Sequence, residues 1–272
     1  MRSRWWILLL LLVGLGLVSA GWLCESGSPS PEVYALMYGR SQSFEDAVLE
    51  GGSHRKVDFG WFVFPFRTSA GWGLVDTGFE DPAMAEEFQL ETLDPAASLL
   101  GDLGVEPGEI RDVILTHGHW DHIGAVAAFP RARLWLSRPE WEAMQGALRD
   151  KARAAGYRRA DLDRLEEARR GGRLRLFSDQ ARVTPGVVVR VVGGHTPGCL
   201  AVCFADRLVL AGDNAYLYRS LEQDIPIAPQ ARQGGPDALP HLRRFPGKLV
   251  PGHDPRILDR EPRVTQRVAR LL

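Results

Sequence analysis

The stretch Leu115–Ala125 reads L-T-H-G-H-W-D-H-I-G-A and places four metal-binding side chains within six residues. These are His117, His119, Asp121 and His122. Imidazole and carboxylate groups bind zinc and also iron, nickel or manganese. A lone histidine is more often a core or surface residue than a ligand, but four such residues at H-x-H-x-D-H spacing reverse that expectation. The stretch is therefore a candidate metal centre.

The residues on either side of this motif predict a turn between a strand and a helix. Asp112–Thr116 is apolar and β-branched, which is typical of a buried strand, and Ile123–Phe129 is rich in alanine and could form a helix. The carboxyl end of a strand is where open sites form in layered α/β folds. The first two histidines of the motif then point the same way and can hold one ion, while its Asp and third His can reach a second.

Three more candidate ligands each follow an apolar, strand-like run and a glycine. They are His195 in V-V-G-G-H-T-P-G, Asp213 in L-V-L-A-G-D-N and His253 in L-V-P-G-H-D-P. His54 and His241, which complete the seven histidines, are predicted to lie at the surface. Together with the motif at 117–122, four predicted strands each lead into a turn that carries candidate ligands. Packing alone does not readily explain this repeated pattern.

These motifs resemble the full two-metal ligand set of the metallo-β-lactamase superfamily. The sequence D-T-G at Asp76–Gly78, after an apolar strand, is another landmark of that superfamily. The similarity runs from about residue 33 to 258. It implies an α/β fold, a four-layer αββα sandwich, and the order of predicted elements, two halves of strands followed by helices, favours the same architecture.

The resemblance also implies a role for each residue. One metal would be held by His117, His119 and His195, the other by Asp121, His122 and His253, with Asp213 bridging the two. Asp76 would orient the ligands, as metal sites usually require, although a plain turn residue before Thr-Gly is the alternative. Two divalent ions are implied, with Zn²⁺ favoured and Fe, Mn or Ni as alternatives.

A water that bridges two divalent ions has a pKa lowered toward about 7 and supplies hydroxide at neutral pH. Such a hydroxide would attack a carbonyl group while the metals hold the oxyanion, which suits ester, lactone, thioester, amide or phosphodiester hydrolysis. The candidate catalytic residues are Asp121 in the ligand cluster and Tyr216 in G-D-N-A-Y-L-Y.

A tyrosine at position 216 resembles the N-acyl homoserine lactonase branch, where the phenol binds the lactone carbonyl or assists the leaving oxygen. A phenol with a pKa near 10 is a reasonable proton donor to a developing alkoxide. The alternative is that Tyr216 only packs over a helix start. The segment L-E-Q-D-I-P-I at Leu221–Ile227 also resembles that branch. The sequence thus predicts a binuclear hydrolase that opens a lactone or ester such as an N-acyl homoserine lactone.

Four other functions fit the same motifs less well. A glyoxalase II-like thioesterase usually carries a C-terminal helical domain, but only about twenty residues follow His253. Asp213 as the bridging ligand argues against a β-lactamase. The third alternative is a mononuclear iron oxygenase, such as a persulfide dioxygenase. The fourth is a non-catalytic metal-binding module. The net charge of −1 gives no electrostatic case for nucleic acid, so the expected partner is a small ester or lactone.

The first residues predict export. Arg2 and Arg4 precede an apolar run, and Val18–Ala20 is an acceptable cleavage site, so residues 1–24 read as a signal peptide. A membrane anchor through residues 5–23 and a lipid on Cys24 are the alternatives, and all three place the domain in the periplasm or cell envelope or outside the cell. Residues 25–32 read as a flexible tether, and 33–272 as one hydrolase domain. The sequence does not indicate an oligomeric state.

Several other segments carry expectations. Phe59–Phe66 is a strongly aromatic core strand, some of whose rings could line a pocket near the metals. Residues 139–172 form a helical insert that is either a lid or a solvated helical pair. Cys199 and Cys203 lie about 13 Å apart if they share a strand, so both are predicted to be small core residues without a disulfide. A weak helix is predicted from Thr265.

Overall fold

The computed structural model describes residues 30–150 and 156–272. The expectations for residues 1–24 concern the part of the chain outside this description. Among the described residues, none of the helices has the length and apolar character required to span a membrane.

The larger of two sheets has the strand order β13-β1-β2-β3-β5-β6-β7, with β4 paired to β1. Strands β3, β5, β6 and β7 run parallel, whereas β1 pairs antiparallel with both β13 and β2. The strands are β1 (Glu32–Phe44), β2 (Lys56–Thr68), β3 (Gly71–Val75), β4 (Thr92–Leu93), β5 (Ile110–Ile114), β6 (Arg133–Ser137), β7 (Leu174–Phe177) and β13 (Val268–Arg270).

The smaller sheet has the order β12-β11-β10-β9-β8. Its strands are β8 (Gln180–Thr184), β9 (Val187–Val191), β10 (Leu200–Phe204), β11 (Leu208–Leu210) and β12 (Lys248–Val250). Strands β11 and β12 are parallel, and β10 is antiparallel to both β9 and β11. It follows that β9, β11 and β12 all run in one direction and end at the same edge.

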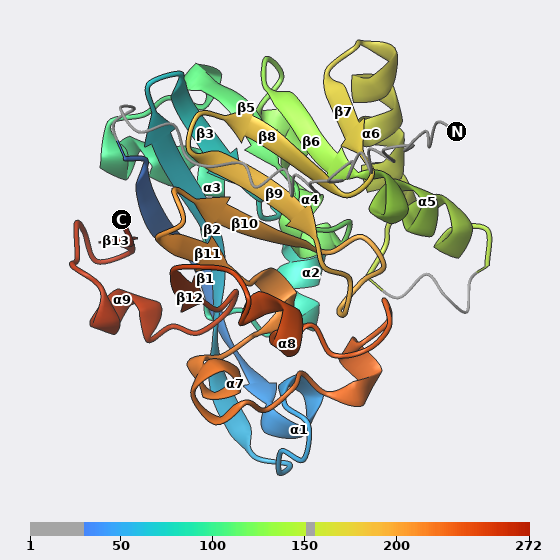
Figure 1. Cartoon of the computed structure of the whole chain (residues 1–272), viewed down its shortest axis with the longest axis vertical. Coiled ribbons are helices and arrows are strands. Elements are labelled where there is room, and N and C mark those ends of the chain that lie inside the picture. The colour runs from blue at the N-terminus through green and yellow to red at the C-terminus, as the bar shows by residue number, and fades with distance from the viewer. Residues whose placement is uncertain (1–29, 151–155) are drawn as a thin grey trace, which may run out of the picture.

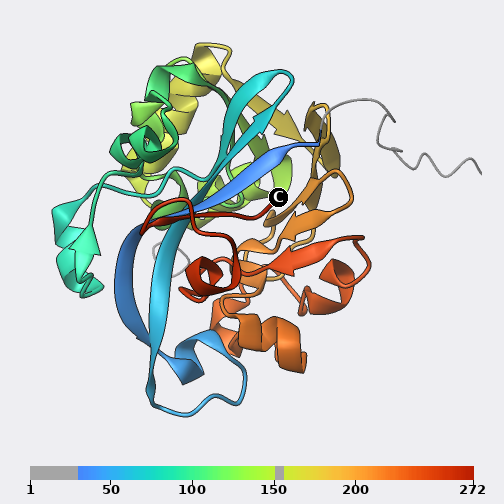
Figure 2. The same ribbon diagram turned by 90° about the vertical axis from the view of Figure 1, so that its left-hand side faces the viewer.

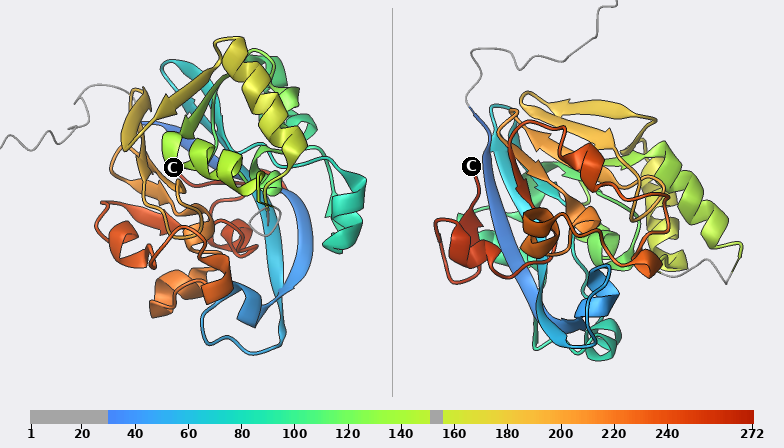
Figure 3. Two further views of the ribbon diagram at one scale, coloured as in Figure 1. Left: turned by 90° about the vertical axis from the view of Figure 1, so that its right-hand side faces the viewer. Right: turned by 60° about the horizontal axis from the view of Figure 1, so that its bottom comes forward.

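The helices are short, and the two longest, α5 and α6, pack against β6 and β7. The α-helices are α1 (Glu45–Val48), α2 (Pro82–Glu87), α3 (Ala96–Leu99), α4 (Trp120–Ile123), α5 (Arg138–Ala147), α6 (Arg159–Arg170), α7 (Tyr218–Gln223), α8 (Leu239–Leu242) and α9 (Ile257–Arg260). The 3₁₀ helices are η1 (Leu100–Leu103), η2 (Pro107–Glu109), η3 (Val126–Ala128), η5 (Gly212–Asn214) and η6 (Pro229–Ala231). Figure 3 shows α5 and α6 side by side next to β6 and β7.

The two sheets face each other between outer helices, as Figure 1 and Figure 2 show from perpendicular directions. Alternation along β2 produces this arrangement, because successive side chains of a strand point to opposite faces. Phe59, Trp61 and Val63 enter the core beneath α3, α5 and α6. Phe62 and Phe64 enter the core between the sheets. The predicted αββα sandwich is confirmed.

Some predicted elements differ in the structure. The helix expected from Thr265 is wrong, because Val268–Arg270 instead forms β13 at the edge beside β1. The helix expected at Ile123–Phe129 begins earlier, at Trp120, and Gly124 ends it before η3. Strands β4 and β8 lie outside those that the sequence predicts. Cys199 and Cys203 are buried, and within the described part of the chain both carry free thiols, as predicted.

Candidate metal centre

The candidate ligands gather where strand ends of the two sheets meet. His117 and His119 follow β5, while Asp121 and His122 lie in α4, which begins immediately after them. From the smaller sheet, three ligands follow the three strands that run in one direction: His195 after β9, Asp213 after β11 and His253 after β12. The shared direction of these strands is what brings residues far apart in the sequence to one edge.

The structure divides the seven side chains into two groups that could each hold a metal ion. Within each group, the candidate ligand atoms lie within 4.8 Å of one another. The first group is His117, His119 and His195, and the second is Asp121, His122, Asp213 and His253.

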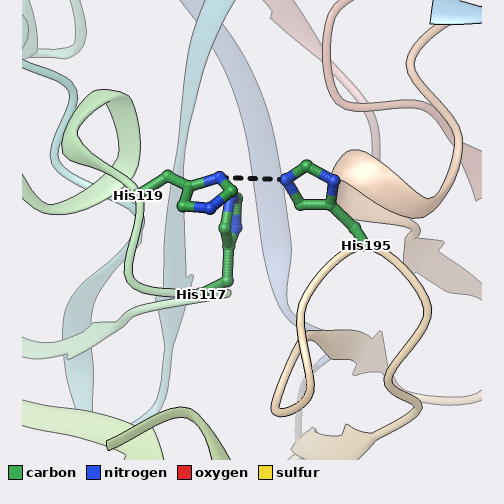
Figure 4. Close-up of side chains that lie close together, drawn as sticks. All are labelled: His117, His119 and His195. Atoms are coloured by element: carbon green, nitrogen blue, oxygen red, sulfur yellow. Dashed lines mark hydrogen bonds between the residues drawn. The ribbon is translucent and has the colours of Figure 1, made fainter. Parts of the chain in front are cut away.

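In the first group, three rings converge from two separate loops (Figure 4). His195 Nε2 lies 3.0 Å from His119 Nδ1. The His117 ring is 4.6 Å from the His119 ring and 4.7 Å from the His195 ring, both nearly edge-on. Three imidazole nitrogens that face one small volume match the ligand set of an open zinc site, which keeps another position for water or substrate.

Asp213 lies between the two groups, the place that the resemblance implies for a bridging ligand. Its Oδ1 atom lies 3.2 Å from both His122 Nε2 and His253 Nε2. Its Oδ2 atom faces the first group, 3.5 Å from His195 Nε2 and 3.9 Å from His117 Nε2. One carboxylate therefore presents one oxygen to each group.

The hydrogen bonds of the imidazoles leave their inward nitrogens for a metal. His195 Nδ1 is 2.7 Å from the Ala231 carbonyl and His253 Nδ1 is 2.9 Å from the Gly60 carbonyl, so each Nδ1 donates a proton. Each Nε2 then carries the lone pair and faces the other ligands of its group. His117 Nε2 is buried and has no hydrogen-bond partner among residues 30–150 and 156–272. Buried polar atoms normally have partners, and a divalent cation would satisfy these. The residues therefore fit a metal pair.

The pKa values of two imidazoles and of the shared carboxylate also suit a bound cation. Burial lowers the pKa of His117 well below its usual range and that of His119 to about 3, so both imidazoles are neutral at pH 7. Burial by itself would raise the pKa of Asp213, but its neighbours His122 and His253 hold it well below its usual range, so the carboxylate is ionised. Neutral imidazoles and an ionised carboxylate are the forms that bind metals.

Asp76 lies behind the second group, at the carboxyl end of β3 and beside the end of the parallel strand β5. Its Oδ2 atom is 2.8 Å from His122 Nδ1, and its Oδ1 atom accepts the Thr116 backbone N–H at 2.8 Å. This geometry lets Asp76 fix the ring of His122 with Nε2 turned inward, the arrangement that raises the basicity of a metal-binding imidazole.

We expect Asp76→Asn to weaken metal binding by about 10- to 100-fold, the usual cost of losing a carboxylate partner behind a metal-binding histidine. The oxygen of the asparagine amide can still accept the Thr116 backbone N–H, so the substitution mainly removes the acceptor for His122 Nδ1. Competition with a metal chelator measures the affinity. The control is Asp58→Asn, which changes a half-exposed carboxyl group paired with Arg40. Equal affinities in the Asp76 variant and the wild type would contradict the role of Asp76.

Tyr216 reaches the centre from the loop between η5 and α7. Its hydroxyl lies 3.2 Å from His195 Nδ1, and its ring stands 5.7 Å from the His253 ring. Burial first, and then the charges of Asp213 and Asp121, raise the pKa of Tyr216 well above its usual value. The hydroxyl therefore remains protonated at neutral pH and can donate to an oxygen.

A pocket of about 320 Å³ opens over both groups and over Tyr216. Three aromatic side chains, Trp61, Phe88 and Trp120, form one part of its lining. The ring of Trp120 is 5.7 Å from that of Trp61 and 4.7 Å from that of Phe88. The expectation that rings of the aromatic strand line a pocket near the metals is met by Phe59 and Trp61.

The sequence reading missed several residues that hold the ligand loops. Asn214 Oδ1 accepts the His195 backbone N–H at 2.8 Å, and the Tyr38 hydroxyl donates to the Asp121 carbonyl at 3.0 Å. The position of Asn214 next to Asp213 could have suggested its role. Glu140, which contacts two ligand loops, carries no signal in the sequence beyond lying near a helix start.

Comparisons with known proteins agree with this geometry. The family model described as the metallo-beta-lactamase superfamily matches residues 62–257. A probable metallo-hydrolase of Mycobacterium tuberculosis is 30% identical over 220 residues, which cover 72% of this chain and 66% of that protein, slightly under two thirds of its length. An N-acyl homoserine lactonase of Bacillus cereus is 24% identical over 214 residues, 71% of this chain and 80% of the relative.

A solved structure shares the fold. It is a variant of the lactonase AiiA of Bacillus thuringiensis with N-decanoyl-L-homoserine bound at its active site. The two chains are 20% identical with a TM-score of 0.68, and the match covers 85% of this chain and 96% of the other.

Proposed function

The chain belongs to the metallo-β-lactamase superfamily, and we propose that it is a metal-dependent hydrolase that opens lactones or related esters, with N-acyl homoserine lactones as the substrate class. The observation that carries the proposal is the pair of ligand groups that share Asp213 beneath a pocket containing Tyr216. The names of the Bacillus relatives support the choice of substrate class.

When bound, two divalent ions would act as Lewis acids and lower the pKa of water for attack on a carbonyl. The protein's own part is to present seven ligand side chains at the floor of the pocket, to leave a position open for the substrate, and to supply one proton. The Tyr216 hydroxyl is the group placed to donate to the carbonyl oxygen or to the leaving alkoxide. The surrounding aromatic side chains exclude water from one side of the pocket.

We propose Zn²⁺ as the resident ion, because three imidazoles with an open position and a mixed imidazole and carboxylate group are both usual zinc environments. Iron, manganese and nickel accept the same donors, so metal content has to be measured directly. The experiment is to count metal ions per chain and assay the same sample against an acyl homoserine lactone, an aryl ester, a glutathione thioester and a cephalosporin.

About two zinc ions per chain with preferred turnover of the lactone would support the proposal. Two ions with preferred turnover of the thioester or cephalosporin would keep the hydrolase and reject the lactonase. One iron per chain without hydrolysis of any substrate would reject the hydrolase and indicate an oxygenase.

We expect Phe88→Ala to lower kcat/KM for a decanoyl lactone about tenfold and to leave a butanoyl lactone nearly unchanged. The Phe88 ring stands at the mouth of the pocket, 39% exposed, against Trp120. A tenfold change corresponds to about 1.4 kcal/mol, within the range for one partly buried apolar side chain. Phe44→Ala is the matched control, because Phe44 is 40% exposed and stacks on His54 instead. Equal losses for both acyl chains would place the acyl group elsewhere.

We also propose that the domain works outside the cytoplasm, on the basis of Arg2, Arg4 and the apolar run that follows them. The intact mass of the protein recovered from cells tests this. Loss of about twenty residues indicates a cleaved signal, a diacylglyceryl mass on Cys24 a lipoprotein, and the full mass in a membrane fraction an anchor. Full-length protein in the cytoplasm would contradict the proposal.

A further inference from the structure

One buried carboxylate ties together the two loops that carry the first ligand group. Glu140 lies in the first turn of α5 and is completely buried. Its Oε1 atom accepts the Gly118 backbone N–H at 2.8 Å, and its Oε2 atom accepts the Gly198 backbone N–H at 3.0 Å. Gly118 separates His117 from His119, and Gly198 lies three residues after His195.

A second residue at the start of α5 also forms a hydrogen bond with the Gly198 loop. The Ser137 hydroxyl donates to the Gly198 carbonyl at 2.7 Å and accepts the Glu140 backbone N–H at 3.1 Å. Both backbone polar groups of Gly198 are thus held by one helix start, its carbonyl by the N-cap residue Ser137 and its N–H by Glu140 in the first turn. The approach is close enough that a Cβ atom on Gly198 would lie 2.2 Å from both Ser137 Oγ and Glu140 N.

The same carboxylate also supports the ring of His119. The Tyr157 hydroxyl donates to Glu140 Oε1 at 3.0 Å, and the Tyr157 ring lies edge-on to His119 with 4.9 Å between ring centroids. The neighbouring Gly156 also packs closely against the His119 ring, since a Cβ atom on Gly156 would lie 2.3 Å from His119 Cδ2. Glu140 therefore supports His119 in two ways. It holds the backbone of the preceding residue, Gly118, and through Tyr157 it supports the imidazole ring.

We propose that Glu140 is a positioning residue that sets the distance between the His117–His119 loop and the His195 loop, and so selectively tunes the first of the two metal groups. The proposal rests on the proposed metal-binding function. If Glu140 has this role, the helical segment around α5 is neither a lid nor only a solvated helical pair, because the start of α5 contacts the loops that carry the ligands. The second group receives its support elsewhere, from Asp76 and from the Gly60 carbonyl.

Glu140→Gln tests this with little change in shape. A carboxylate can accept with both oxygens, whereas an amide accepts with only one, so the variant must lose either the Gly118 or the Gly198 contact. We expect zinc to bind the first group about 10- to 100-fold more weakly, the usual effect of losing a partner that orients metal ligands, with the second group unchanged. The matched control is Glu142→Gln, which removes the same charge from an exposed position of α5.

The readout is a zinc titration of the metal-free full chain, followed through the ¹⁵N signals of the histidine rings. In Glu140→Gln, the signals of His117, His119 and His195 should reach their bound positions only at higher zinc, while those of His122 and His253 follow the wild type. Equal weakening of both groups would mean a general structural role and overturn the proposal, as would a titration identical to the wild type.

A second variant covers the case in which Glu140→Gln does not fold. Ser137→Ala keeps the Glu140 carboxylate but removes the donor to the Gly198 carbonyl and the acceptor of the Glu140 backbone N–H. We expect a smaller weakening confined to the same three rings. No effect on these rings would overturn the proposal. A wild type that binds no zinc would instead overturn the proposed function, so the two failures are distinguishable.

Discussion

Asp213→Ala is expected to release both metal ions and to lower kcat/KM by well over 100-fold. Asp213 is the side chain with an oxygen toward each group, 3.2 Å from His253 Nε2 on one side and 3.5 Å from His195 Nε2 on the other. Loss of a residue that only orients a ligand costs about 10- to 100-fold in metal affinity or activity. Removing a carboxylate shared by two cations must cost more, since it also leaves them to repel each other across the gap.

The comparison that isolates this role is Asp121→Ala. Asp121 is within reach of the second group alone, with its Oδ2 atom 3.1 Å from His122 Nε2. We therefore expect the Asp121 variant to keep one ion per chain and the Asp213 variant to keep none after dialysis against the same chelator buffer. Metal analysis and circular dichroism on the same samples separate metal loss from unfolding. One tightly held ion in Asp213→Ala would contradict a bridging carboxylate.

The ligand set could be anticipated from the sequence because its signals are local. Each ligand follows an apolar run and, in three cases, a glycine turn, and both features can be recognised without knowing which strands are neighbours. That the ligands meet also follows from strand direction, since β9, β11 and β12 end at one edge. The spacing within the His117–His122 motif already predicted two ions, and the resemblance to a known family divided the three distant ligands between them.

The parts that the sequence could not supply depend on contacts between distant segments. Glu140 is separated from Gly118 by 22 residues and from Gly198 by 58. A buried glutamate near a helix start has the same local signature as the exposed Glu142 two positions later. The mistaken C-terminal helix has a similar cause. Val268–Arg270 becomes a strand because it pairs with β1, and pairing overrides a weak local preference.

Tyr216→Phe should lower the rate of lactone opening by about 10²- to 10⁴-fold, the range for a positioned proton donor, while both metals stay bound. The hydroxyl lies beside His195 without being one of the candidate ligand atoms, so its loss should not release an ion. The chain offers a matched control in Tyr218→Phe. Tyr218 is also buried, but its hydroxyl has no hydrogen-bond partner among the residues that the structure describes, and Arg260 lies 4.1 Å from the centre of its ring.

The two possible roles of Tyr216 predict different dependence on the leaving group. If the phenol donates to the departing oxygen, the loss in Tyr216→Phe should be large for a lactone, whose alkoxide is strongly basic, and small for an aryl ester or thioester. If it binds the carbonyl oxygen, the loss should be similar for all three substrates, because each develops the same oxyanion. Measured kcat values across this series, with zinc content confirmed at each point, decide between them. Wild-type rates on every substrate would remove Tyr216 from the mechanism and, with it, the residue that most specifically favours a lactonase.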